Sequence, residues 1–217
     1  MHRTNTYHIE TITVLERKNT LEFDRYDILV NRLHPYREED YQGREMVETK
    51  DIEGNLIKVE KEAYEHYLLF QKKLQSLGIE VSISSGYRTL EEQQQVIDEF
   101  YSRYPKEEAD KMVAPVGASE HHTGLALDIT VRTHDDYLSN QLDNEKQGNY
   151  DKQYQIMETV CRDYGFILRY PKEKEMLTGV SYEPWHFRYV GYPLSKEIMD
   201  HHLTLEEYLE EKCLVEE

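Results

Sequence analysis

Two separated stretches of the chain carry side chains that bind divalent cations. Residues 119–128 offer the imidazole of His121 and the carboxylate of Asp128, and residues 183–190 offer the imidazole of His186. Two histidines and one aspartate leave one position open on a tetrahedral Zn²⁺, which is typical of a catalytic rather than a structural site. The sequence therefore predicts one zinc ion at a hydrolytic centre.

Asp128 interrupts a run that is otherwise apolar, with Leu125-Ala126-Leu127 before it and Ile129 after it. A carboxylate in such a strand is costly unless a cation compensates it. That cation could be an arginine as well as a metal, because buried charges are usually paired in one way or another. A single histidine in a strand is likewise often structural, so the hypothesis depends on the histidines and Asp128 converging.

Two further residues fit a hydrolytic centre. Glu183 lies three residues before His186 and precedes Pro184, which favours an extended or turn conformation. It could serve as a base for a metal-activated water without being a ligand. Arg88 lies between a predicted strand and a predicted helix cap; it is either a surface arginine or a fixed cation that stabilises an oxyanion. A donor preorganised in this way contributes about 3–4 kcal/mol.

Other histidines fit the metal site less well. His122 follows His121 directly, and in an extended segment its side chain would point the opposite way. His201 and His202 have no acid at a useful spacing, which indicates surface positions.

The first half of the chain predicts elements that could carry these residues. A capping box of Thr89 and Glu92 marks the start of one helix. Gly54 marks a β-hairpin turn and Gly78 a helix end. The predicted elements are strands at 7–14, 27–30 and 79–83, a hairpin at 47–59, and helices at 61–77, from 89 to about 104, and after Pro105.

The second half predicts a turn at Gly124 and a strand over 125–131 that carries Asp128. Residues 132–150 are polar and without periodicity, and a segment of this kind beside catalytic residues is often a lid. The remaining elements are a helix at 151–164, strands at 166–168 and 185–190, and a C-terminal helix that starts with a Thr204–Glu207 capping box. In the last strand Trp185 and Phe187 should pack in the core while His186 faces a cleft. We expect an α+β fold, with an N-terminal extension at 1–26 and one domain at 27–217.

Composition limits the possible partners. The formal charge of −17 over 217 residues argues against nucleic acid or an anionic membrane surface as a partner. No stretch approaches the roughly 18 apolar residues that span a bilayer, and the N-terminus does not read as a signal peptide. We therefore expect a cytoplasmic location, unless a leader was removed. Cys161 and Cys213 have no metal-ligand neighbours, and a disulfide between them is not expected in that compartment.

Together these residues resemble the zinc D-Ala-D-Ala peptidases of the VanX, VanY and VanXY type. The family pattern Ser-x-His-x-x-Gly-x-Ala-x-Asp is met by residues 119–128, its Glu-x-x-His by Glu183 and His186, and its Tyr-Arg-Ser/Thr by Tyr87, Arg88 and Thr89. The stretches 164–171 and 182–191 are most similar to VanY and VanXY proteins. The resemblance covers roughly residues 27–210, without the hairpin around Gly54.

The resemblance implies the Hedgehog/D,D-peptidase fold, an antiparallel sheet flanked by helices with a zinc cleft on the sheet. It implies His121, Asp128 and His186 as zinc ligands, Glu183 as the general base that activates the zinc-bound water, Arg88 as the carbonyl-polarising group, and Ser119 as a group for the substrate's terminal carboxylate. The expected function is a D-alanyl-D-alanine carboxypeptidase acting on peptidoglycan precursor peptides. The alternatives are a D,D-dipeptidase or bifunctional enzyme, an L,D-carboxypeptidase, and a non-catalytic zinc-binding domain.

Overall fold

The computed structural model describes residues 26–38, 44–131 and 144–215. The predicted strand at 7–14 and most of the predicted lid at 132–150 lie outside this part of the chain. The division into an extension at 1–26 and a domain at 27–217 stays a prediction.

The centre of the fold is an antiparallel four-stranded sheet with the strand order β3-β4-β6-β5. Its register sets Asp128 directly opposite His186 on β6, and opposite Ser85 on β3. Side chains on one strand alternate between the two faces of a sheet, so Asp128 and His186 share one face. The strands are β3 (Ser82–Ser85), β4 (Ala126–Thr130), β6 (His186–Tyr189) and β5 (Phe166–Leu168).

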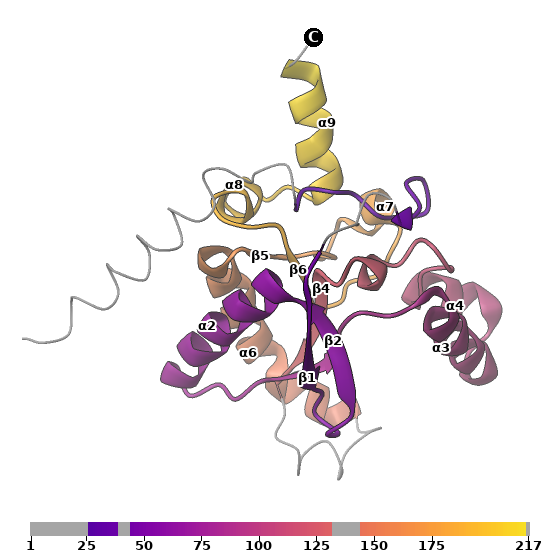
Figure 1. Cartoon of the computed structure of the whole chain (residues 1–217), viewed down its shortest axis with the longest axis horizontal. Coiled ribbons are helices and arrows are strands. Elements are labelled where there is room, and N and C mark those ends of the chain that lie inside the picture. Colours follow the sequence, from indigo (N-terminus) through magenta and orange to yellow (C-terminus); the bar gives the residue numbers. More distant parts are fainter. Residues whose placement is uncertain (1–25, 39–43, 132–143, 216–217) are drawn as a thin grey trace, which may run out of the picture.

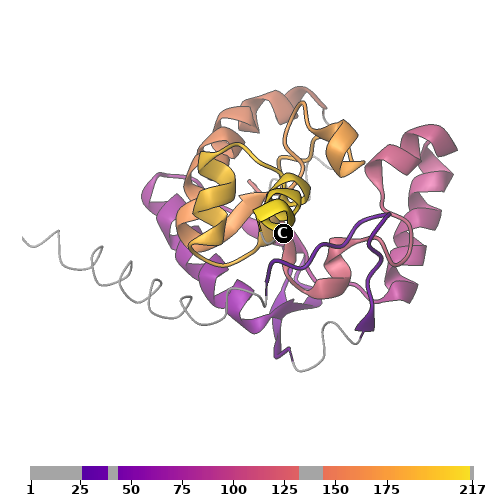
Figure 2. The ribbon, with the colours of Figure 1, turned by 90° about the horizontal axis from the view of Figure 1, so that it is seen from above.

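The opposite face of the sheet carries the main hydrophobic core. Leu127, Ile129 and Phe187 point there and pack with Phe70 of helix α2 (Lys61–Ser76). Helix α6 (Asn144–Cys161) lies beside α2 and adds Met157. Figures 1 and 2 show both helices on the same side of the molecule. Burial of these residues leaves the Asp128 face free for a site.

The cleft face is bordered by other elements. Helices α3 (Leu90–Arg103) and α4 (Lys106–Met112) lie together, well away from α2 and α6 in Figure 1. The capping box at Thr89 is formed in full, as predicted. The 3₁₀ helix η3 (Glu120–Thr123) precedes β4, and the short helix α7 (Glu175–Thr178) precedes β6.

The remaining elements support the sheet from its edges. The predicted hairpin is confirmed as β1 (Met46–Lys50) and β2 (Leu56–Glu60). The 3₁₀ helix η4 (Arg162–Tyr164) follows α6. A second apolar cluster includes Ile167 of β5 and joins it to α8 (Leu194–Asp200) and α9 (Leu205–Val215). The predicted Thr204–Glu207 capping box is confirmed at the start of α9.

Three predictions about elements were wrong. Residues 27–30 form no strand; instead the carbonyls of Tyr26 and Ile28 accept hydrogen bonds from Arg188 Nη2. The strand predicted from residue 79 begins only at Ser82. The helix predicted from residue 151 begins at Asn144, within the segment that lacked periodicity.

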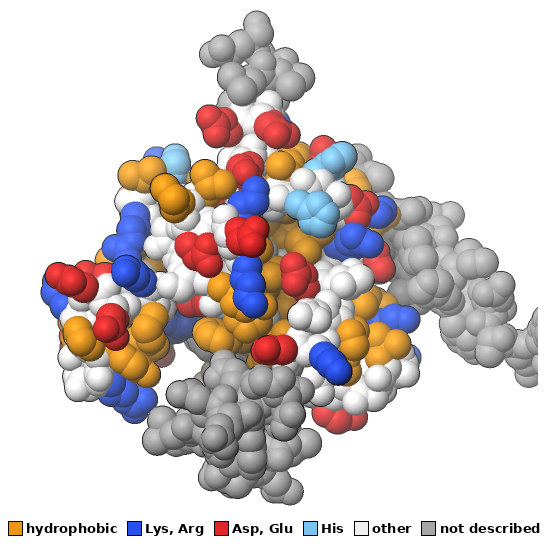
Figure 3. Space-filling model, turned by 180° about the vertical axis from the view of Figure 1, so that it is seen from behind, with side chains coloured by type: hydrophobic (Ala, Val, Ile, Leu, Met, Phe, Trp, Pro, Cys, Tyr) orange, Lys and Arg blue, Asp and Glu red, His pale blue; other side chains and the backbone are white. Residues whose placement is uncertain are grey.

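The surface mixes charges of both signs. On the face seen from behind, acidic and basic side chains are interspersed with apolar ones and no extended basic area is formed (Figure 3). Within the described ranges, every helix is too short or too polar to cross a membrane.

Candidate active site

His121 is placed by the short helix η3 and the turn that follows it. The Ser119 side chain caps η3 by accepting a hydrogen bond from the His121 N–H. Gly124 ends the helix with a φ of +73°, a left-handed conformation that glycine adopts without strain. The chain then reverses into β4, and His121 Nε2 comes to lie 3.4 Å from Asp128 Oδ2.

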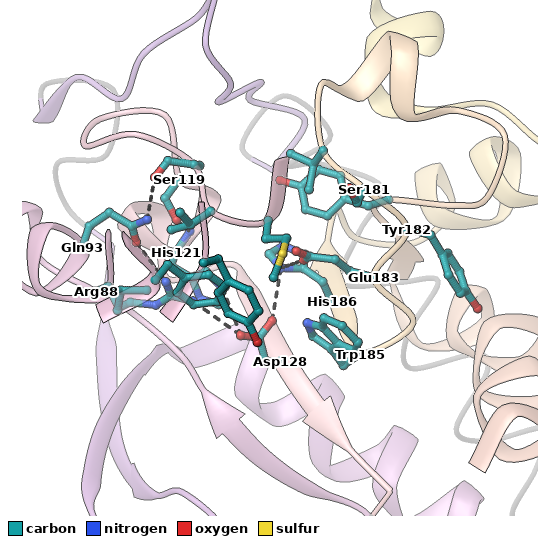
Figure 4. Close-up of a pocket in the computed structure, with 18 residues that line it drawn as sticks. Arg88, Gln93, Ser119, His121, Asp128, Ser181, Tyr182, Glu183, Trp185 and His186 are labelled. Atoms are coloured by element: carbon teal, nitrogen blue, oxygen red, sulfur yellow. Dashed lines mark hydrogen bonds and ion pairs between the residues drawn. The ribbon is translucent and has the colours of Figure 1, made fainter. Parts of the chain in front are cut away.

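His186 completes a compact cluster with His121 and Asp128. Ligand atoms of the three side chains all lie within 4.8 Å of one another, and His186 Nδ1 is 3.1 Å from Asp128 Oδ1. Oδ1 is buried and has no hydrogen-bond partner in the described part of the chain. An orphaned carboxylate oxygen between two imidazoles fits a cation, and this N₂O donor set suits Zn²⁺. Figure 4 shows Asp128 between the two histidines.

The electrostatics of the cluster also suit a cation. Burial, with help from Arg88, lowers the pKa of His121 to about 4, so its imidazole is neutral and able to bind a metal. Burial alone would raise the pKa of Asp128, but His121 and His186 hold it well below its usual range. Burial alone would lower the pKa of His186, yet Asp128 and Glu120 raise it to about 9. A metal would therefore displace a proton from His186 on binding.

Glu183 lies beside the cluster but is separate from it. Its Oε2 is 3.5 Å from His186 Nδ1, and its backbone N–H donates to the carbonyl of Tyr170. Burial raises the pKa of Glu183 to about 7, with Asp128 adding to the rise and His186 and Arg88 opposing it. A carboxylate with a pKa near 7 is suited to act as a general base at neutral pH.

Arg88 is fixed from three sides, which excludes the surface interpretation. Its Nε donates to Ser85 Oγ at 3.1 Å, its Nη1 to Gln93 Oε1 at 2.9 Å, and its Nη2 lies 3.4 Å from Asp128 Oδ2. Gln93 is itself held by its hydrogen bond to the carbonyl of Ala114. The guanidinium therefore points at the metal cluster in a set orientation, as Figure 4 shows.

The cluster opens into a cleft of about 330 Å³. Ser119 lines this cleft, so it is placed where a substrate could reach its hydroxyl. Trp185 also lines the cleft and is only half-buried, so the prediction that it packs in the core was wrong. The prediction for Phe187 was correct, because its side chain lies in the core.

Three histidines that the sequence excluded from the metal site lie outside the cluster: His122, His201 and His202. His122 is buried, but it donates from Nδ1 to the carbonyl of Arg88 and accepts at Nε2 from the N–H of Gly117. His201 and His202 are exposed.

Sequence reasoning missed three residues around the site. Gln93 holds Arg88, and its position in step with Val96 and Ile97 on a helix could have indicated an inward-facing amide. Tyr170 is buried with its ring 4.7 Å from that of His186. Glu120 is fully buried next to His121, and no sequence signal beyond its place in the motif marked it.

Comparison with known proteins finds relatives in sequence and in fold. The chain is 41% identical over 133 residues to the putative carboxypeptidase YodJ of Bacillus subtilis, covering 61% of this chain and 46% of that protein. It therefore spans about half the length of this curated relative. Its fold is similar to that of a vancomycin-resistance D,D-pentapeptidase VanY variant solved with Zn(II), with a TM-score of 0.69, 30% identity, and coverage of 86% and 99%. The L,D-carboxypeptidase LdcB gives a TM-score of 0.66, 35% identity, and 84% coverage of both chains.

The antiparallel sheet, the His–Asp–His cluster on one of its faces and the carboxylate beside it form one domain with a candidate metal centre. The sequence profile of the VanY family, described as D-alanyl-D-alanine carboxypeptidase, matches residues 56–192. The chain belongs to this family, and the predicted α+β fold is confirmed.

Proposed function

We propose that this protein is a zinc-dependent D-alanyl-D-alanine carboxypeptidase that removes the terminal D-Ala from peptidoglycan precursor peptides. The observation that carries the proposal is the convergence of His121, Asp128 and His186 with Glu183 beside them in one cleft. The family match and the Zn(II)-bound VanY neighbour support it.

In this proposal each residue has a separate task. His121, Asp128 and His186 would hold one Zn²⁺, which when bound supplies a Lewis acid that acidifies water and polarises a carbonyl. Glu183 takes the proton of the attacking water and returns it to the leaving amine of D-Ala.

Two further residues would bind charged oxygens of the substrate. Arg88 faces the reacting carbonyl and stabilises the oxyanion, because its guanidinium is fixed before substrate arrives. Ser119 binds the terminal carboxylate through its hydroxyl proton, which its capping bond leaves free because there its oxygen is the acceptor.

The lining of the cleft favours a carboxypeptidase over a dipeptidase. A D,D-dipeptidase must bind the free amine of its substrate, for which an additional acid would be suited. Among the described residues, the acids that line the cleft are Asp128 and Glu183. Both already have roles at the metal, so no spare carboxylate is left for an amine in this part of the chain.

The second candidate is an L,D-carboxypeptidase, favoured by the similarity to LdcB. Both reactions release D-Ala and need the same metal centre and base. They differ in the configuration of the penultimate residue, which the cleft must accommodate beside Trp185 and Tyr170.

One experiment separates these functions. The zinc-loaded protein is incubated with D-Ala-D-Ala, with an acylated peptide ending in D-Ala-D-Ala, and with a tetrapeptide ending in an L-centre followed by D-Ala. D-Ala release from the acylated D,D-peptide alone supports the proposal. Release from the tetrapeptide alone supports the L,D activity, and release from the dipeptide supports a dipeptidase or bifunctional enzyme. No release from any of them contradicts a peptidase.

A further inference from the structure

A buried carboxylate lies behind the metal cluster, on the far side of His186. Glu120 is 1% exposed and sits on η3 directly before His121. Its Oε1 accepts hydrogen bonds from Arg169 Nε at 2.8 Å and from Arg188 Nη1 at 2.7 Å. Burial alone would raise the pKa of Glu120, but the two guanidinium groups hold it well below its usual range.

The second oxygen of Glu120 is differently placed. Oε2 is buried and lies 3.7 Å from His186 Nε2, slightly too far for a direct hydrogen bond. Neither atom has a hydrogen-bond partner elsewhere in the described ranges. Two buried, unsatisfied polar atoms that face each other are each other's natural partners, since leaving either one unpaired is costly.

The other ring nitrogen of His186 faces the cluster. Nδ1 is 3.1 Å from Asp128 Oδ1 and 3.5 Å from Glu183 Oε2. His186 thus has one nitrogen toward the metal ligands and one toward Glu120. The hydrogen bond of one ring nitrogen decides which nitrogen of a histidine is free to bind a metal.

We propose that Glu120 is a positioning residue that keeps the proton of His186 on Nε2 and so leaves Nδ1 as the metal-binding nitrogen. This inference rests on the proposed zinc site but not on the identity of the substrate. It also implies that the two histidines use different atoms. His121 donates from Nδ1 to the carbonyl of Gly86, so it binds through Nε2.

The two arginines beside Glu120 fix the orientation that a glutamine would take there, so Glu120→Gln tests the proposal. A glutamine at this position must turn its carbonyl oxygen toward Arg169 and Arg188, because an amide NH₂ there would face two guanidinium donors. Its NH₂ then points at His186 Nε2. When Nδ1 binds zinc, the proton of His186 is on Nε2, so this N–H and the glutamine NH₂ would be two donors that face each other. The substitution should therefore lower zinc affinity by about 10- to 100-fold.

Glu206→Gln is the matched control. Glu206 accepts hydrogen bonds from both terminal nitrogens of the same Arg169, at 2.7 and 2.8 Å. The carboxylates that pair with His186 among the described residues are those of Glu120, Asp128 and Glu183, and not that of Glu206. The Glu206→Gln substitution therefore perturbs the same buried arginine without changing the partner of His186 Nε2. Zinc affinity is measured by competition with a chelator, after thermal melting has shown that both variants are folded.

The wild-type protein provides a second readout. Nitrogen-15 NMR of the zinc-loaded, histidine-labelled chain should show His186 protonated at Nε2 and coordinated at Nδ1, and His121 the reverse. The proposal is overturned if His186 coordinates through Nε2, if folded Glu120→Gln binds zinc as tightly as wild type, or if Glu206→Gln weakens binding equally. None of these measurements uses a substrate, so inactivity toward D-Ala peptides would contradict only the proposed function.

Discussion

His121 Nδ1 donates a hydrogen bond of 2.7 Å to the carbonyl oxygen of Gly86. Gly86 directly follows β3, so this bond ties the helix η3 to the sheet that carries Asp128. It fixes both the orientation of the imidazole and the nitrogen that faces the cluster. The geometry of the proposed metal site therefore depends on the backbone at Gly86.

The position of Gly86 gives the first prediction. A Cβ atom there would lie 2.6 Å from the carbonyl oxygen of Lys58, so the backbone must move. Gly86→Ala should lower the free energy of unfolding by about 1–3 kcal/mol and weaken zinc binding. Gly54→Ala is the control, because its hairpin turn has open space around the added carbon. It should cost stability through its positive φ but leave zinc affinity unchanged; equal loss of affinity in both variants would contradict the prediction.

Arg88→Lys tests the guanidinium. A lysine keeps the charge, but its three donors share one nitrogen, so they do not reproduce the planar fork that reaches Ser85, Gln93 and the substrate oxyanion. We expect kcat to fall by about 10²–10³-fold, as when a preorganised oxyanion donor is removed, with zinc affinity little changed. Arg103→Lys, at an exposed i,i+4 pair with Glu99, should keep full activity. Wild-type turnover by Arg88→Lys would remove Arg88 from the mechanism.

Glu183→Ala and Glu183→Gln test the base. Both should retain zinc, because Glu183 is not one of the three clustered ligands, and both should lose activity by about 10²–10⁴-fold. Zinc content by elemental analysis and D-Ala release together check this. Glu175→Gln, at an exposed position on α7, should behave as wild type. Near-full turnover by Glu183→Ala would refute the assignment.

Much of the fold was predictable because local signals agreed with the tertiary structure. Turn glycines, one capping box and apolar spacing marked the hairpin, α2 and α3 at nearly their observed bounds, and a second capping box marked the start of α9. The predictions failed where tertiary contacts determine the backbone conformation. Residues 27–30 look like a strand, but their segment is held by the Arg188 guanidinium instead of a neighbouring strand.

The convergence of the proposed ligands could be expected from the sequence, but the residues that support them could not. Residue type and spacing indicated His121, Asp128, His186 and Glu183, because a buried acid among apolar residues needs a cation. Glu120 and its arginines escaped notice, because their pairing joins segments about 49 and 68 residues apart. No local sequence pattern indicates a contact between segments that are so far apart in the chain. Alternation alone also misplaced Trp185, which directly precedes β6 and lines the cleft.

Metal removal should change stability as well as activity. A ligand that binds only the folded state stabilises it, by about 4 kcal/mol at 1,000 times its dissociation constant. Added zinc should therefore raise the melting temperature of the stripped wild-type protein. Asp128→Asn should lose most of this rise, while His201→Ala, at an exposed position, should keep it. An unchanged melting temperature in saturating zinc would contradict the site.

Cys161 should behave as a buried thiol without reactivity. Its side chain is fully buried in the core, and burial, with Glu158 adding to it, raises the pKa of the thiol far above its usual value. Only the thiolate reacts with disulfide reagents, so raising the pH from about 7 to about 9 should speed labelling of the unfolded chain but not of the folded one. In a Cys213→Ala background, which leaves this single cysteine, a chromogenic disulfide reagent should react in urea and not in buffer. Rapid labelling of the folded protein would show that the core packing around α6 is wrong.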